Sequence, residues 1–167
     1  MNYTKINQEA VKSIMDGGKY GFNVPGCWDG NYLIVTMDGC RAYYLPKDKV
    51  VFDQSKIKDI GKVFPDIEKV RLPENEVHLT KTYVESGLSR KQLLRVFRGR
   101  RDKKSWKVYI DSAMLKMLAK EDYIISFYQD YDAKADMSTK PIFAFLPSGT
   151  PLMVMMPVRV FDEEEFE

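Results

Sequence analysis

The sequence predicts an α+β fold made of two similar halves, and three observations support this prediction. The segments Tyr3–Met15 and Lys107–Leu118 share one pattern, in which a short strand-like run, a helix N-cap candidate and an amphipathic helix follow one another. Three strand-like runs rich in aromatic and branched residues follow each helix. In each half, the last two of these runs meet at a turn that contains glycine. Each half is therefore predicted as strand, helix and three antiparallel strands.

The first half covers about residues 1–53. Its leading run ends at Ile6, and Asn7 is the N-cap candidate of a helix whose apolar face includes Val11. The runs KYGFNV, NYLIVTM and CRAYYLP are predicted as strands. The last two are joined at Asp38-Gly39, where glycine makes a positive φ inexpensive.

The connection covers about residues 54–105 and includes an inserted basic hairpin. The run QSKIKDIGKVF at residues 54–64 predicts a brief helix broken by Gly61. The runs VHLTKTYVES and RKQLLRVFRG predict a strand pair around a turn at Gly87. No low-complexity linker divides the chain, so residues 1–167 are predicted to form a single domain.

The second half covers about residues 106–160 and repeats the first. Asp111 is the N-cap candidate, and DYIISFY, PIFAFLP and PLMVMMPVRV are the predicted strands, with a turn at Ser148-Gly149. At an offset of about 104 residues Lys12 corresponds to Lys116, which indicates an internal repeat. Chance similarity between two amphipathic helices that precede hairpins would produce much of the same pattern.

The composition is typical of a globular protein of the cytoplasm. No run of about 18 apolar residues is present, and the N-terminus lacks the pattern of a signal peptide, so the cytoplasm is the expected compartment. Cys27 and Cys40 form no CxxC pair and are expected to be ordinary reduced cysteines.

Charge is distributed unevenly along the chain. The acidic tail at residues 161–167 holds five of the 24 acidic residues, which leaves 19 against 26 basic residues and a net charge of +7 for the body. A basic block contains nine bases and one acid, Asp102; its bases are Arg90, Lys91, Arg95, Arg98, Arg100, Arg101, Lys103, Lys104 and Lys107. Two interpretations are open: a binding site for a phosphate backbone, or a solvated loop. The tail would be drawn to any basic surface within reach.

Short motifs in the two halves, taken in their order along the chain, resemble a known family. A strand ending in Asp-Gly-x-Arg, then a strand led by proline, then a final strand closing on Met-Pro-x-Arg, occur in this order. The residues concerned are Asp38, Gly39, Arg41, Pro141, Met156, Pro157 and Arg159. The pattern resembles the bacterial DNA sliding clamp, the β subunit of DNA polymerase III, over Ile6–Pro46 and Val108–Val160.

The resemblance implies a DNA-clamp-like fold, with two β-α-β-β-β halves related by a pseudo-twofold axis. It also implies a non-catalytic protein that binds DNA without reading sequence, acts as a processivity or accessory factor in replication, and contacts replication proteins through short peptides. Clamp subunits of this family carry three such domains and close a ring as dimers, whereas this chain is long enough for about one domain. Either several copies assemble as a homo-oligomer, or the fold is used without a ring.

Clamp helices face the DNA, so the resemblance assigns DNA backbone contacts to helix lysines. Lys12, Lys116 and Lys120 lie opposite the apolar faces of the predicted helices, and Lys116 and Lys120 are expected to share one face. From the basic block, we expect phosphate contacts from Arg95, Arg98, Arg100, Arg101, Lys103 and Lys104. The alternative is that these are ordinary surface residues.

Apolar residues allow two interpretations as well. The Met-rich run PLMVMMPVRV is either a groove for partner peptides or core packing. Phe97 and Trp106 either stack on bases of a single strand or belong to the core. A clamp-fold module that binds only a protein partner is the alternative function.

The sequence offers little for catalysis, so no enzyme, metal or cofactor is predicted. His78 is the only histidine, and no Gly-rich phosphate loop is present. The acidic run with Asp130, Asp132 and Asp136 departs from a calcium loop because Ala135 occupies the glycine position. A metal-dependent nuclease that combines these acids with the basic block is a further alternative.

Overall fold

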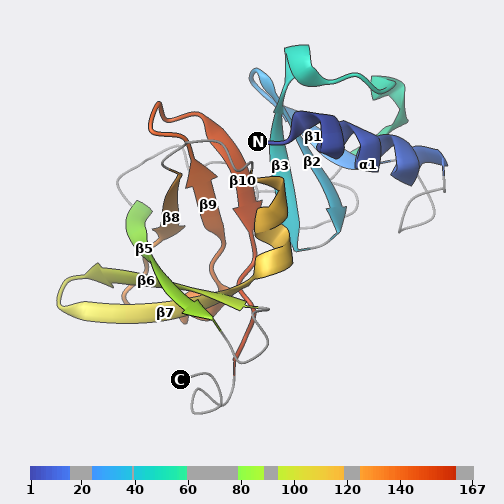
Figure 1. Cartoon of the computed structure of the whole chain (residues 1–167). Coiled ribbons are helices and arrows are strands. Elements are labelled where there is room, and N and C mark those ends of the chain that lie inside the picture. Colours follow the sequence, from blue (N-terminus) through green and yellow to red (C-terminus); the bar gives the residue numbers. More distant parts are fainter. Residues whose placement is uncertain (16–23, 39, 60–78, 89–93, 119–124, 161–167) are drawn as a thin grey trace.

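The structure is a computed structural model that describes residues 1–15, 24–38, 40–59, 79–88, 94–118 and 125–160 (Figure 1). Its mixed helix and strand content agrees with the predicted α+β class. Helix α1 covers Tyr3–Met15, and the 3₁₀ helices are η1 (Lys47–Lys49), η2 (Gln54–Lys56), η5 (Ser112–Met117) and η6 (Met137–Thr139). The strands are β1 (Val24–Asp29), β2 (Tyr32–Asp38), β3 (Arg41–Pro46), β4 (Ile57–Asp59), β5 (Leu79–Leu88), β6 (Leu94–Arg101), β7 (Lys104–Asp111), β8 (Ser126–Asp130), β9 (Ile142–Phe145) and β10 (Pro151–Met155).

The described strands form one ten-stranded sheet with the order β4-β1-β2-β3-β10-β9-β8-β5-β6-β7. Every pairing is antiparallel except the one between β1 and β4. Around the β3–β10 pair the order is symmetric, because β2 and β1 lie on one side as β9 and β8 lie on the other (Figure 1). A helix precedes β1 and a 3₁₀ helix precedes β8, so the two three-stranded units repeat the predicted order of helix and strands.

Both helices pack on the same face of the central strands. Ile6 and Ala10 of α1 and Met117 of η5 belong to one buried cluster, which also contains Tyr43 of β3 and Met153 of β10. The backbone N–H of Asn2 donates to the carbonyl oxygen of Met117 at 2.9 Å, which joins the start of α1 to the end of η5. The two halves therefore share one core.

The opposite face of these strands is also apolar. Ile34, Tyr44 and Val154 are buried there together with Ala42 and Phe143. Because β10 is buried on both faces, its methionines Met153 and Met155 belong to the core, which confirms the core interpretation of the Met-rich run.

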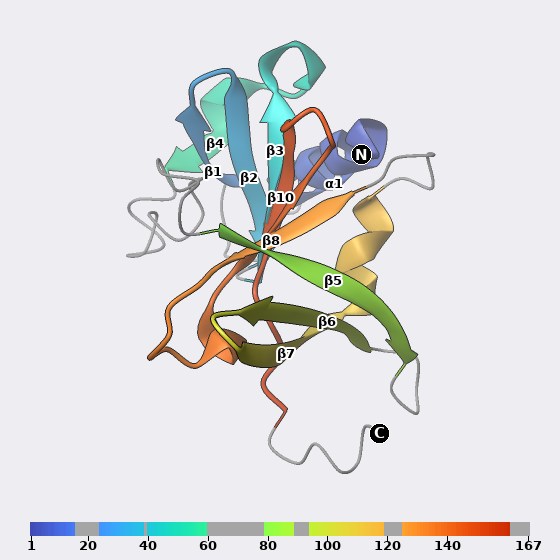
Figure 2. The same ribbon diagram turned by 90° about the vertical axis from the view of Figure 1, so that its left-hand side faces the viewer.

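The second half of the sheet curls back on itself. Figure 2 shows β5, β6 and β7 running crosswise to β2 and β3. At the end of this curl, the N–H of Val158, just after β10, donates to the carbonyl oxygen of Tyr109 in β7 at 2.7 Å. The predicted insertion is therefore integral to the sheet, because β5 pairs with β8 and β6 pairs with β7.

The first half lacks its predicted leading strand, because α1 begins at Tyr3 and includes Ile6. Asn2 caps this helix, and its Oδ1 accepts from the N–H of Lys5 at 3.0 Å. The prediction of Asn7 as N-cap is wrong. Asn7 lies inside the helix with only 5% of its surface exposed, and its side chain binds a distant segment instead.

The second predicted helix is confirmed at its start and wrong in its length. The Asp111 side chain caps η5 by accepting from the N–H of Ala113 at 2.8 Å. The helix ends at Met117 because Leu118 is extended, with φ −73° and ψ 110°. Lys116 lies in η5, and Lys120, with which it is predicted to share a face, lies outside the described residues.

Two other local predictions change. Residues 54–59 form η2 and then β4 rather than one helix, and Gly61 lies outside the described residues. β5 continues through Gly87 to Leu88, and its register with β6 shifts between Glu85 and Leu88, so Gly87 lies at a β-bulge and not at the turn.

The turn at Ser148-Gly149 between β9 and β10 is confirmed, with φ 81° at Gly149. At the matching turn β2 ends at Asp38, which pairs with Arg41, while Gly39 is outside the described residues. Within the described residues, no helix is long and apolar enough to cross a membrane.

Asn7 connects α1 to the segment after β3, and its replacement tests this connection. Its Nδ2 donates to the carbonyl oxygens of Tyr3 (2.9 Å) and Lys49 (2.8 Å), and its Oδ1 accepts from the N–H of Val51 (3.0 Å). We expect Asn7→Ala to lower the free energy of unfolding by about 1–3 kcal/mol, because the backbone groups of Tyr3, Lys49 and Val51 lose these hydrogen bonds. Urea unfolding measures this, with the exposed neighbour Gln8→Ala as control. Equal stability of the two variants would contradict a structural role for Asn7.

Candidate nucleic-acid interface

The part of the basic block from Arg95 to Lys107 lies in the antiparallel hairpin of β6 and β7. Eight residue pairs join the strands, from Leu94 opposite Asp111 to Arg101 opposite Lys104. The two-residue turn, Asp102 and Lys103, has positive φ at both positions, 50° and 65°. Such a turn matches the twist of the flanking strands and leaves no loop at the tip.

Alternation along the two strands sorts the basic residues onto different faces. Arg98 and Arg100 are exposed on the outer face of the hairpin, where register places Lys107 opposite Arg98 and Ser105 opposite Arg100. On the inner face Phe97 and Val108 are buried in the core. Arg98, Arg100 and Lys107 therefore form what we call the outer basic face. Lys107 enters this set through its register with Arg98, which the sequence alone does not provide.

Two bases at the tip have intramolecular partners. The guanidinium of Arg101 lies 5.3 Å from the ring centroid of Tyr131, and its Nε is 3.8 Å from Asp102 Oδ2. The Nζ of Lys104 donates to the carbonyl oxygen of Ala133 at 2.8 Å. These contacts attach the tip to the loop between β8 and β9.

Trp106 of β7 packs against residues of β8 and of the same loop. Its ring stacks on Tyr131 with centroids 5.1 Å apart, and its Nε1 donates to Gln129 Oε1 at 2.6 Å. Gln129 is fully buried, and its Nε2 donates to the carbonyl oxygens of Met137 and Lys140. The indole is thus fixed in place, and it belongs to the support of the hairpin rather than to a surface for stacked bases. Phe97 is likewise in the core.

The remaining predicted contacts are dispersed. Arg95 is half-buried on the inner side and lies opposite Ile110, whereas Lys103 is exposed in the turn. Lys12 on α1 and Lys116 on η5 are exposed, each on its own helix. Arg90 and Lys91 lie outside the described residues, as do His78 and the acidic tail.

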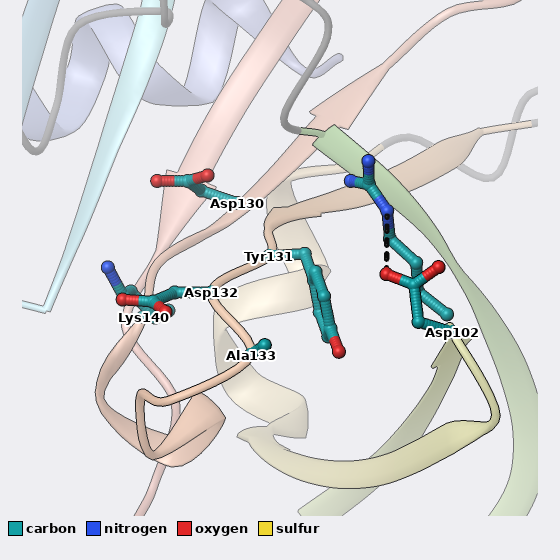
Figure 3. Close-up of a pocket in the computed structure, with 7 residues that line it drawn as sticks. Asp102, Asp130, Tyr131, Asp132, Ala133 and Lys140 are labelled. Atoms are coloured by element: carbon teal, nitrogen blue, oxygen red, sulfur yellow. Dashed lines mark ion pairs between the residues drawn. The ribbon is translucent and has the colours of Figure 1, made fainter.

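A hollow of about 520 Å³ lies beside the tip, lined by residues of the hairpin and of the β8–β9 loop. Figure 3 shows Tyr131 between Asp102 of the hairpin and Asp132 and Lys140 of the loop. Three acids and two bases line this hollow, so it lacks the excess of positive charge that an anion requires. The outer basic face does not open into it.

Two acidic residues of the β8–β9 loop stabilise turns. Asp132 Oδ1 accepts from the N–H of Lys134 at 2.9 Å, and Asp136 caps η6 by accepting from the N–H of Ser138 at 2.9 Å. Hydrogen bonds from Ser138 hold the pKa of Asp136 below its ordinary value, and the nearby charge of Arg159 adds to this shift. No group of three or more potential metal ligands occurs among the described residues.

Two residues of the clamp-like motifs, Arg41 and Met156, join the halves. Arg41 Nη1 donates to the carbonyl oxygen of Ala113 in the segment of η5 at 3.4 Å, and its guanidinium lies 5.8 Å from the ring centroid of Tyr43. The N–H of Met156 donates to the carbonyl oxygen of Cys40 at 2.7 Å. Pro141 is buried, Pro157 is half-buried and Arg159 is exposed.

No family model, curated protein or solved structure matches this chain.

Gly99 makes the close packing of Trp106 feasible and provides a test of the hairpin's support. A Cβ at position 99 would overlap the six-membered ring of Trp106, which Tyr131 and Gln129 hold in place. We expect Gly99→Ala to destabilise the protein by about 1–3 kcal/mol, as overpacking does. Urea unfolding of Gly99→Ala, Trp106→Leu and the double variant measures the coupling. If Gly99→Ala lowers the free energy of unfolding by the same amount in the Trp106→Leu background, this explanation is refuted.

Proposed function

We propose that this chain is a non-catalytic DNA-binding protein that contacts the phosphate backbone through the outer basic face of the β6–β7 hairpin, Arg98, Arg100 and Lys107. The observation that carries the proposal is the direct pairing of Arg98 with Lys107 across the two strands. Together with Arg100, this pair gathers three basic side chains on one face of the hairpin. Basic side chains that meet phosphates release condensed counterions, so such a face favours binding of a polyanion.

The composition of the face favours phosphate contacts over base contacts. Arg98 and Arg100 are exposed and Lys107 is half-buried, and the exposed Ser105 lies beside them. Neither Asn nor Gln, the side chains that pair with adenine edges, is among these residues. Arginine forms bidentate contacts with phosphate oxygens, and such contacts carry no sequence information. Binding is therefore proposed to be independent of sequence.

The clamp-like arrangement is part of the same proposal. It is supported by the symmetric strand order about β3–β10 and by the position of α1 and η5 on one face of the sheet. In this arrangement Lys12 and Lys116 would add contacts if the helices face the DNA. The chain departs from a clamp domain in its missing leading strand and its short η5, and encirclement of DNA would require several copies.

A specific observation also favours the alternative, a module that binds protein. The large hydrophobic side chains that are exposed in the described part of the chain gather at one groove along α1. This groove is separate from the outer basic face, so the two functions are compatible within one chain. The nuclease alternative lacks support, because the loop acids are engaged in turns.

The outer basic face predicts a specific change in salt dependence. If Arg98 and Arg100 each contact a phosphate, the variant Arg98→Ala/Arg100→Ala should flatten the slope of log K against log salt by roughly 2, because about 0.9 counterion is released for each contact. Fluorescence anisotropy with several unrelated duplexes measures the slope. The control Lys56→Ala/Lys134→Ala removes the same charge from exposed positions outside the hairpin.

An identical slope in the two double variants would contradict the assignment of the hairpin. Loss of binding to some duplex sequences only would contradict backbone recognition. The same titration on nicked circular and linear DNA tests the clamp-like part of the proposal. Slower dissociation of the protein from the circle supports encirclement, and equal dissociation from both DNAs contradicts it.

A further inference from the structure

The exposed apolar side chains are concentrated in one place. Three large hydrophobic residues are exposed among the described residues, Val11 (38%), Met15 (80%) and Val51 (78%). All three line a groove of about 640 Å³ between α1 and the segment that follows β3. Scattered exposed hydrophobic residues need no explanation, but a patch in a groove indicates a binding surface.

The groove has a fixed shape. Asn7 forms part of its lining, and its side chain bonds to the backbone of Lys49 and Val51 on the opposite wall. These bonds hold the wall that carries Val51 against α1. The groove is therefore present before any partner arrives, which lowers the entropic cost of binding.

The surroundings of the groove carry a positive charge excess. Lys12 and Lys49 line it together with Asp48, which lies 3.2 Å from the Lys49 ammonium group. Over α1 and residues 47–56 the chain has five lysines against three acids. The complementary occupant is an acidic peptide with large apolar side chains.

The chain itself contains such a peptide at residues 161–167, outside the described residues. In the sequence FDEEEFE, four consecutive acids separate Phe161 from Phe166. The preceding residues lead away from the groove, because Val158 pairs with β7 at the far end of the sheet from β1 and α1 (Figures 1 and 2).

The position of the tail favours capture by a second molecule. Seven residues extend at most about 25 Å. They follow a segment that pairs with β7, whereas α1 contacts β1 and β2 at the other end of the strand order. We propose that the groove binds residues 161–167 of a second copy of this chain, with a phenylalanine ring against Val11, Met15 and Val51 and the carboxylates toward Lys12 and Lys49. This inference does not depend on DNA binding.

Such a contact is heterologous, because the tail of one copy meets the groove of the next. Repetition of the contact closes a ring if the rotation permits it and otherwise extends a filament. In either case each junction between copies would have the same defined contact.

The first test uses the full chain with its own tail disabled by Phe161→Ser/Phe166→Ser. A fluorescein-labelled peptide FDEEEFE is titrated against it and read by anisotropy. We expect saturable binding that Val51→Asp weakens by about tenfold or more, because a ring loses its apolar contact. The matched control Ser148→Asp, which adds the same charge on an exposed turn, should leave the affinity unchanged.

A variant of the outer basic face separates this proposal from simple charge attraction. Arg98→Ala/Arg100→Ala should leave peptide binding unchanged if the groove is the site. Absence of binding at millimolar peptide would overturn the proposal. So would a loss of peptide affinity in Arg98→Ala/Arg100→Ala that equals or exceeds the loss in Val51→Asp. Circular dichroism and urea unfolding of each variant confirm that the fold is retained.

The second test mixes two defective copies. Neither the Phe161→Ser/Phe166→Ser chain nor the Val51→Asp chain should self-associate in sedimentation velocity. Their mixture should form a 1:1 dimer, because the first supplies a groove and the second supplies a tail. Oligomers of either variant alone, or no dimer in the mixture, would contradict the exchange of tails.

Discussion

The pairing of β3 with β10 is the interaction on which the rest of the structure depends. Tyr43 lies opposite Met153, and Ala42 lies opposite Val154, so each pair places buried side chains on one face of the sheet. Neither three-stranded unit has a complete core of its own, because α1, η5 and these two strands contribute to the same buried cluster. Arg41 and the backbone of Met156 reinforce this junction from the ends of the strands. Two halves that share one core cannot unfold independently at modest cost.

The rigidity of this core extends to the hairpin. Phe97 packs against Phe127 with ring centroids 4.6 Å apart, and Trp106 is held between Gly99 and Tyr131. The side chains on the inner face of β6 and β7 are therefore packed in the core. Because side chains alternate between the two faces of a strand, Arg98, Arg100 and Lys107 lie on the outer face. A basic surface on a fixed ribbon loses little entropy on binding a polyanion, because only its side chains must become ordered. The groove along α1 is stabilised in a similar way by Asn7, on a different part of the molecule.

The sequence predicted the strands better than the contacts between them. Period-two patterns identified most strands and the turn at Gly149, since these depend on local chemistry. Asn7 was predicted as a helix cap, but its partners Lys49 and Val51 are more than 40 residues away and no local pattern reveals them. The basic block was evident from composition, yet the membership of Lys107 in one face follows only from the register with Arg98. The turn at Asp102 and Lys103 has no glycine to mark it.

DNA is proposed to bind the outer basic face of the β6–β7 hairpin. The most direct measurement is a two-dimensional NMR titration of the isotope-labelled full chain with a short duplex of arbitrary sequence. We expect the largest shifts at the Arg98 and Arg100 guanidinium groups and at the backbone amides of β6 and β7, with the same pattern for a second unrelated duplex. Shifts centred on α1 and η5, or no shifts at low salt, would contradict the account.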